Sequence, residues 1–139
     1  MTQAEFKGDV SALDAWAALA ESPAAALIDV RTAVEWAFVG IPELSSLKKT
    51  THRLEWQKFP GWARNESFLD EVLAAGLQSE QPLYLMCRSG VRSRAAAIEL
   101  AAHGFTTYSI ADGFEGQLNP NGQRGVGGWR ALGLPWKQT

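Results

Sequence analysis

Pro82–His103 reads PLYLMCRSGVRSRAAAIELAAH and predicts a strand, a tight loop and a helix. The apolar run Leu83–Met86 is typical of a short strand that is buried on both faces of a sheet. From Ser93 the sequence is rich in alanine and aliphatic residues up to Gly104, a residue type that commonly ends helices. A buried strand that leads directly into a helix is typical of a parallel α/β sheet.

The loop between strand and helix begins with the only cysteine of the chain, Cys87, and contains two arginines and a glycine. In so short a loop the backbone N–H groups turn inward, and the positive end of the helix dipole adds to them. A cup of this kind binds an anion and favours the thiolate form of a cysteine at its base. Cys87 is therefore the predicted nucleophile, in preference to an inert buried thiol.

The loop resembles the active-site loop of the rhodanese family, in which a cysteine is followed by Arg, a small residue, Gly and a second Arg. In that family the cysteine takes up a sulfane sulfur as a persulfide, the loop amides hold it, and a thiophilic acceptor removes it. The resemblance implies that Cys87 is catalytic, that Arg92 holds the anion, and that Arg88 assists or faces solvent. The full anion-binding and substrate-binding set implied is Arg88, Ser89, Gly90, Val91, Arg92 and Ser93.

Three further blocks extend the resemblance from about residue 27 to residue 136. Leu27–Arg31, LIDVR, is similar to the first block of the family, and Asp112–Gly116, DGFEG, is similar to a turn that lies close to the active-site loop. Gly128–Trp136 resembles the closing segment, in which a tryptophan packs back on the domain. The family histidine before Ile41-Pro42 is absent here, and its role in the family is mainly structural.

Asp29, Arg31 and Phe114 are candidates for a second layer around the site. The carboxyl ends of strands face the ligand crevice in open α/β sheets, so Asp29 and Arg31 either border the site or pair with each other as scaffold. Phe114 stands between glycines that allow a close backbone approach, and we expect it to shield the sulfur from water.

Capping signals predict two helices in the first part of the chain. The tetrapeptide Ser11–Asp14 has the form of a capping box and predicts a helix up to Ala20, with Leu13 and Trp16 in the core. The tetrapeptide Thr32–Glu35 is a second capping box and predicts a short helix.

Two stretches have the apolar or β-branched composition of strands, residues 26–30 and 106–110. Leu44–Thr51 gives a poor strand signal, although the resemblance implies a short strand near it. The stretch 116–128 is rich in Gly, Asn and Gln, and it is predicted to be a mobile loop.

Residues 52–65 are aromatic and basic, and they are interrupted by Pro-Gly. Long irregular connections in compact domains are often functional. The segment either forms a wall beside Cys87 or covers one edge of the core, and we favour the second interpretation. Its aromatic residues are Trp56, Phe59 and Trp62. Asn65 is then predicted to cap a helix over 66–75 that directs Leu73 inward.

The chain of 139 residues is long enough for one well-filled core, and we expect a single domain over residues 1–139. The resemblance makes this a rhodanese-like α/β fold, with a parallel five-stranded sheet flanked by helices on both faces. A net charge of -2 gives no reason to expect nucleic acid or a membrane surface as partner. No leader or spanning segment is apparent, so a cytoplasmic location is expected. One cysteine and two distant histidines do not form a metal site, and no cofactor is expected.

The predicted function is sulfur transfer through a Cys87 persulfide. The donor would be thiosulfate or a persulfide, and the acceptor a thiol, cyanide or a protein. The alternative is a rhodanese-like interaction module that is non-catalytic or only carries sulfur. Cysteine phosphatases, some with this fold, need one more residue between cysteine and arginine than the four that separate Cys87 from Arg92, so phosphate-ester hydrolysis is disfavoured.

Overall fold

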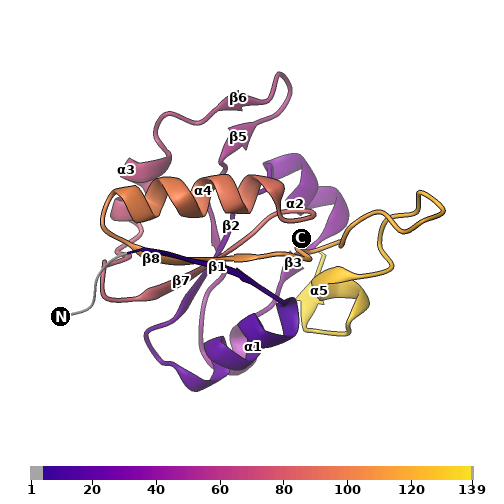
Figure 1. Cartoon of the computed structure of the whole chain (residues 1–139), viewed down its shortest axis with the longest axis horizontal. Coiled ribbons are helices and arrows are strands. Elements are labelled where there is room, and N and C mark those ends of the chain that lie inside the picture. The colour runs from indigo at the N-terminus through magenta and orange to yellow at the C-terminus, as the bar shows by residue number, and fades with distance from the viewer. Residues whose placement is uncertain (1–4, 139) are drawn as a thin grey trace.

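The computed structural model describes residues 5–138, so the ends of the domain predicted over 1–139 lie outside the described residues. A parallel sheet of five strands forms the centre, in the order β1-β8-β7-β2-β4 (Figure 1). The strands are β1 Phe6–Val10, β2 Ala26–Asp29, β4 His52–Arg53, β7 Pro82–Met86 and β8 Thr106–Ile110. The parallel five-stranded α/β sheet predicted from the sequence is confirmed.

Helices cover both faces of this sheet (Figure 1). The helices α3 Phe68–Ala74 and α4 Val91–Ala102 pack on one face, where the buried cluster includes Leu85. The helices α1 Ala12–Glu21 and α5 Gly128–Ala131 pack on the other, around a second cluster. Leu83–Met86 of β7 are all buried, and successive strand residues point to opposite faces of the sheet. Both sides of β7 are therefore covered.

Short elements connect the layers. The helix α2 Ala33–Val39 follows β2, and the 3-10 helix η1 Ser45–Leu47 precedes β4. Near the end of the chain, β9 Trp136–Lys137 pairs antiparallel with β3 Ile41–Pro42. The strands β5 Gln57–Lys58 and β6 Ala63–Arg64 form a separate antiparallel hairpin above α4 in Figure 1.

The strand, loop and helix predicted for Pro82–His103 are present, but α4 begins two residues earlier than Ser93, at Val91. Gly90, the N-cap of α4, has φ +103°, a conformation that glycine adopts easily. The loop therefore turns at Gly90, and the helix begins at the next residue. Gly104, with φ +96°, ends α4 as predicted.

The strand β1 was not predicted. Its burial alternates along FKGDV, as expected of an edge strand with one covered face, but Gly8 and two charged residues masked this pattern. The short strand that the resemblance implied near Leu44–Thr51 is β4, which begins just after that stretch. Two residues are too few to give a strand signal of their own.

Two inward residues were predicted wrongly. Leu13 is 53% exposed, because α1 turns the small residues Ala12 and Ala15 toward the sheet, and Leu73 is 54% exposed on α3. Trp16 is partly buried against the core, as expected.

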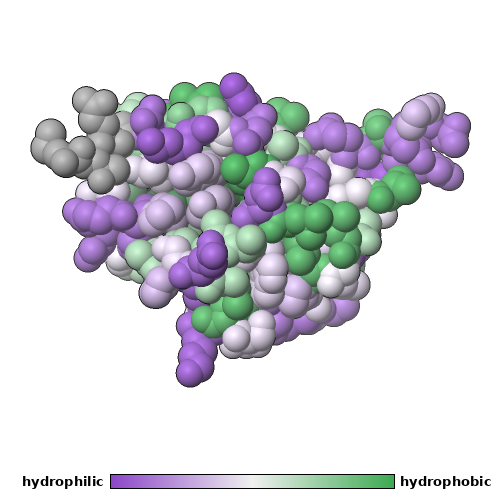
Figure 2. Space-filling model, turned by 60° about the horizontal axis from the view of Figure 1, so that its bottom comes forward, coloured by the Kyte–Doolittle hydropathy of each residue, from purple (hydrophilic) through white to green (hydrophobic). Residues whose placement is uncertain are grey.

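Seen from the side of α1 and α5, the surface mixes hydrophilic side chains with a compact apolar patch (Figure 2).

The predicted cap of α3 is also displaced. Ser67 precedes the helix, while the Asn65 side chain accepts a hydrogen bond from Ser67 N and donates to Glu71. Asn65 thus closes the turn before α3 rather than the helix itself. Among residues 5–138, no helix is long and apolar enough to cross a membrane.

Candidate active site

Cys87 lies at the carboxyl end of β7, in the centre of the sheet, and is 1% exposed. The backbone N–H of Gly90 donates to Cys87 Sγ at 3.0 Å. On the side of α4, Sγ lies 3.4 Å from Ser93 Oγ, and this hydroxyl lies 2.8 Å from Ser109 Oγ. The sulfur therefore has polar partners both in the loop and on the side of α4.

Ser109 was missed by the sequence analysis. It lies on β8, and its hydroxyl and that of Ser93 are both buried. A serine within a β-branched and aromatic run that predicts a sheet strand was the available signal, because a buried hydroxyl requires a partner.

The turn Asp112–Gly116 supports the Cys87 loop from behind. Phe114 N donates to Cys87 O at 2.9 Å, and Glu115 N donates to Arg88 O at 3.0 Å. A Cβ atom at Gly113 would lie 2.5 Å from Arg88 O, so a side chain there would displace the loop. The close approach implied by the resemblance is confirmed, and it depends on glycine.

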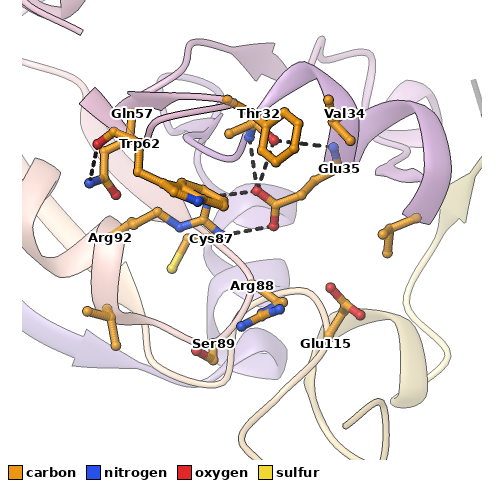
Figure 3. A pocket seen from close by; sticks show the side chains of 13 residues that line it. Thr32, Val34, Glu35, Gln57, Trp62, Cys87, Arg88, Ser89, Arg92 and Glu115 are labelled. Carbon is orange, nitrogen blue, oxygen red and sulfur yellow. Dashed lines mark hydrogen bonds and ion pairs between the residues drawn. The ribbon is translucent and has the colours of Figure 1, made fainter. Parts of the chain in front are cut away.

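A pocket of about 540 Å³ opens over Cys87 (Figure 3). Of the predicted loop residues, Cys87, Arg88, Ser89, Val91 and Arg92 line it, whereas Gly90 and Ser93 contact the sulfur instead. The other lining residues come from α2, the β5–β6 hairpin and the 112–116 turn: Thr32, Val34, Glu35, Val39, Gln57, Phe59, Trp62 and Glu115.

The guanidinium of Arg92, predicted to hold the anion, is already paired. Its Nη1 and Nη2 donate to the two carboxylate oxygens of Glu35 at 2.6 and 2.8 Å, a bidentate pair that takes two of the five N–H donors of the guanidinium (Figure 3). Burial alone would raise the pKa of Glu35, but the hydrogen bonds and charge of Arg92 outweigh burial and lower it. The anion-holding role expected for Arg92 stays a prediction, and the ion pair with Glu35, a partner 57 residues away in the chain, was not visible in the sequence.

Glu35 also completes the capping box of α2. Glu35 N donates to Thr32 Oγ1 at 3.3 Å, and Thr32 N donates to Glu35 Oε1 at 3.1 Å, as predicted. The same carboxylate thus fixes the start of α2 and the position of Arg92.

Arg88 is exposed and forms no ion pair within residues 5–138. It faces the pocket on the same side as Glu115 in Figure 3. Of the two arginines that line the pocket, Arg92 is paired with Glu35 and Arg88 has no ion pair among the described residues. In the described part of the chain, no group of three or more His, Cys, Asp or Glu side chains is placed to hold a metal ion.

Asp29 and Arg31 pair with each other, as the scaffold interpretation expected. Arg31 Nη2 lies 2.6 Å from Asp29 Oδ2, both side chains are fully buried, and neither lines the pocket. Arg31 Nη2 also donates to Gly40 O at 2.8 Å. This pair ties the end of β2 to the end of α2.

Phe114 does not shield the sulfur, contrary to our expectation. Its ring is fully buried in the cluster on the α1 and α5 face and lies 4.3 Å from the Arg31 guanidinium. The turn directs its backbone, not its ring, toward Cys87. Gly113 at φ +59° allows this orientation.

The segment 52–65 divides between the two interpretations. Trp56 is buried in the core against Phe68, whereas Phe59 and Trp62 line the pocket and remain 51% and 46% exposed. Their rings form an edge-to-face pair with centroids 5.8 Å apart. The favoured edge-covering interpretation is therefore wrong for Phe59 and Trp62, because the β5–β6 hairpin turns them away from the core.

Solved structures with the same arrangement define the class of fold. The chain superposes on the crystal structure of Rv0390 from M. tuberculosis with a TM-score of 0.86 and 42% identity, covering 97% of this chain and 100% of that one. A rhodanese-like domain protein from Staphylococcus aureus gives a TM-score of 0.61 at 18% identity, with 95% and 98% covered. The polysulfide-sulfur transferase homodimer from Wolinella succinogenes gives a TM-score of 0.62 at 24% identity, covering 94% of this chain and 78% of that one. The fold is rhodanese-like.

Sequence comparison then gives the family. Residues 7–139 match the family model described as the STR4 middle domain, and the chain belongs to this family. The uncharacterized protein RC0915 from Rickettsia conorii is 35% identical over 113 residues, which are 80% of this chain and 81% of the relative. The uncharacterized protein RP600 from Rickettsia prowazekii is also 35% identical over 113 residues, with the same shares of both chains covered.

Proposed function

We propose that this chain acts as one rhodanese-like domain that transfers sulfane sulfur through a persulfide on Cys87, in the cytoplasm. The observation that carries the proposal is the position of Cys87 Sγ, 3.0 Å from Gly90 N at the start of α4 and open to the pocket above it. The fold shared with a polysulfide-sulfur transferase from Wolinella succinogenes supports the same reaction class.

The first step is an attack of the Cys87 thiolate on the outer sulfur of the donor. The S–S bond of the donor breaks, and its electron pair leaves with the remaining fragment, which is sulfite when the donor is thiosulfate. The new Sγ–S bond leaves one negative charge on the outer sulfur. First-turn N–H groups of α4 have no acceptors within the helix, so they are available to this charge.

Arg88 is the residue proposed to receive an anionic donor, since Arg92 is held by Glu35. Ser93 and Ser109 complete a hydroxyl chain that ends at Sγ. In this role the two hydroxyls stabilise the Cys87 thiolate by hydrogen bonds after the transferred sulfur has left. Val91 and Ser89 line the cup without a charge of their own.

The test is intact mass after incubation with inorganic polysulfide and, separately, with thiosulfate. We expect one added sulfur atom, removable by a thiol or by cyanide, and none on the Cys87→Ser variant. That variant is nearly isosteric, and its thermal unfolding serves as the check that the fold is kept. Absence of sulfur uptake from both donors would reject the proposal and favour the non-catalytic interaction module.

A further inference from the structure

We infer that the sulfur acceptor of this site is a small organic thiol with an aromatic or apolar body and no more than one negative charge. The inference rests on the sulfur transfer proposed above and adds the class of acceptor. Pocket size, wall charge and the exposed aromatic pair of the hairpin each support it.

The pocket is larger than sulfur transfer alone requires. Its volume of about 540 Å³ falls within the range of roughly 300–1,000 Å³ that is typical of sites for whole small molecules. The transferred group is one sulfur atom, and cyanide adds only two atoms to it. Most of the pocket is therefore left for an organic body that arrives with the thiol.

The charges of the pocket wall cancel. Besides Cys87, the charged lining residues are Arg88, Arg92, Glu35 and Glu115. Arg92 is neutralised by Glu35 at 2.6 Å, so Arg88 is the one pocket cation without an ion pair in the described chain. An acceptor with several negative charges would meet one cation, a carboxylate and the charge on the sulfur.

Beside the uncharged polar residues Thr32, Gln57 and Ser89, the remaining wall is apolar. Phe59 and Trp62 present an edge-to-face pair, and Trp62 also lies 5.4 Å from the Arg92 guanidinium. Val34 and Val91 complete the rim and are 39% and 75% exposed. Apolar side chains left exposed around a pocket bury their area only when a ligand with an apolar body enters.

In the proposed step the acceptor thiolate attacks the outer sulfur of the Cys87 persulfide. The Sγ–S bond breaks, and its electron pair stays on Sγ as the thiolate. The acceptor leaves as an organic persulfide anion that carries the transferred sulfur, and the proton of the acceptor thiol was released to solvent when the thiolate formed. No oxidant or reductant is needed.

The experiment measures discharge in a single turnover. The protein is loaded with sulfur from inorganic polysulfide, freed of donor, and mixed with 2-phenylethanethiol or with 2-mercaptoethanesulfonate, which carries a sulfonate in place of the phenyl ring. Loss of the added sulfur is followed by intact mass, with rates expressed per thiolate present. We expect 2-phenylethanethiol to react roughly tenfold faster, the scale of one or two aromatic contacts.

Hairpin variants locate the preference. The double variant Phe59→Ala, Trp62→Ala is expected to lose most of the preference for the phenyl thiol, and its discharge is followed on the fraction of protein that intact mass shows to be loaded. Phe38→Ala is the matched control, since Phe38 is 80% exposed on α2 but does not line the pocket, and it should keep the preference.

The outcomes separate the two proposals. Normal sulfur loading with equal discharge by both thiols, or an undiminished preference in the double variant, overturns the inference and leaves sulfur transfer standing. Failure of the native protein to load sulfur overturns both.

Discussion

The carboxylate of Glu35 has two roles in the structure. It caps α2 together with Thr32, and it accepts hydrogen bonds from Nη1 and Nη2 of Arg92. The pair is largely shielded, with 15% of each side chain exposed, so the interaction is stronger than a surface ion pair. In the proposed site, Arg92 is therefore held in the pocket wall, and Arg88 is the arginine that receives the donor. Under the proposed function, Glu35 is a positioning residue that sets which donor charges the pocket accepts.

Replacement of Glu35 by Gln should release Arg92 and improve the use of thiosulfate. Gln keeps the capping box, because its side-chain oxygen can still accept from the helix N-cap. We expect kcat/KM for thiosulfate to rise several-fold relative to kcat/KM for inorganic polysulfide, since an extra free cation favours the dianion.

Glu115→Gln is the matched control for wall charge. It removes one negative charge from the same pocket but leaves Arg92 paired with Glu35. An equal gain in both variants would mean that net charge alone matters and that the Glu35–Arg92 pair has no special role.

At the scale of elements, α4 has glycine at both ends in similar backbone conformations, with φ +103° at Gly90 and +96° at Gly104. Their surroundings differ. A Cβ at Gly90 would lie 2.5 Å from Ala111 O, whereas nothing lies within 4 Å at Gly104. The backbone at the entrance of the helix thus lies directly against Ala111, whereas a side chain at Gly104 would meet open space.

Alanine at each position should separate backbone strain from this contact. Gly104→Ala is expected to lower the free energy of unfolding by about 1–2 kcal/mol, the price of the left-handed conformation alone. Gly90→Ala should lose more, and it should also slow sulfur uptake because the Gly90 N–H moves away from Sγ. Urea unfolding and intact mass measure the two effects, and equal losses in both variants would contradict the proposed contact.

Elements with strong local signals could be predicted from the sequence. The buried strand β7, the helix α4 and the Thr32–Glu35 capping box all depend on residues close together in the chain. Contacts between distant segments could not be predicted. The Glu35–Arg92 pair and the Phe59 and Trp62 wall depend on how α2 and the hairpin are placed, which no local pattern specifies.

For the whole molecule, the closing segment is tied to the active-site loop. Trp129 is fully buried, packs edge to face on Trp16 with centroids 5.7 Å apart, and donates through its backbone N–H to Gly113 O at 2.8 Å. Gly113 in turn lies against the Cys87 loop. Packing at the end of the chain therefore supports the position of the sulfur.

Trp129→Ala should lower the free energy of unfolding by about 3–5 kcal/mol, because a fully buried ring leaves a large cavity. Trp136→Ala is the control, since Trp136 is 40% exposed, and its loss should be clearly smaller. Thermal or urea unfolding compares the two variants, and similar losses would mean that the closing segment is not anchored by Trp129.

Cys87 is the only cysteine in the sequence, so a sulfur atom taken up there meets no second thiol of the same chain. Proteins with a resolving cysteine discharge internally, at a rate independent of their surroundings. If sulfur is loaded as proposed, discharge from this chain is bimolecular, and the lifetime of the bound sulfur falls in inverse proportion to the concentration of acceptor. Under the proposed function, the chain stores sulfur when acceptor thiols are scarce and delivers it when they are abundant.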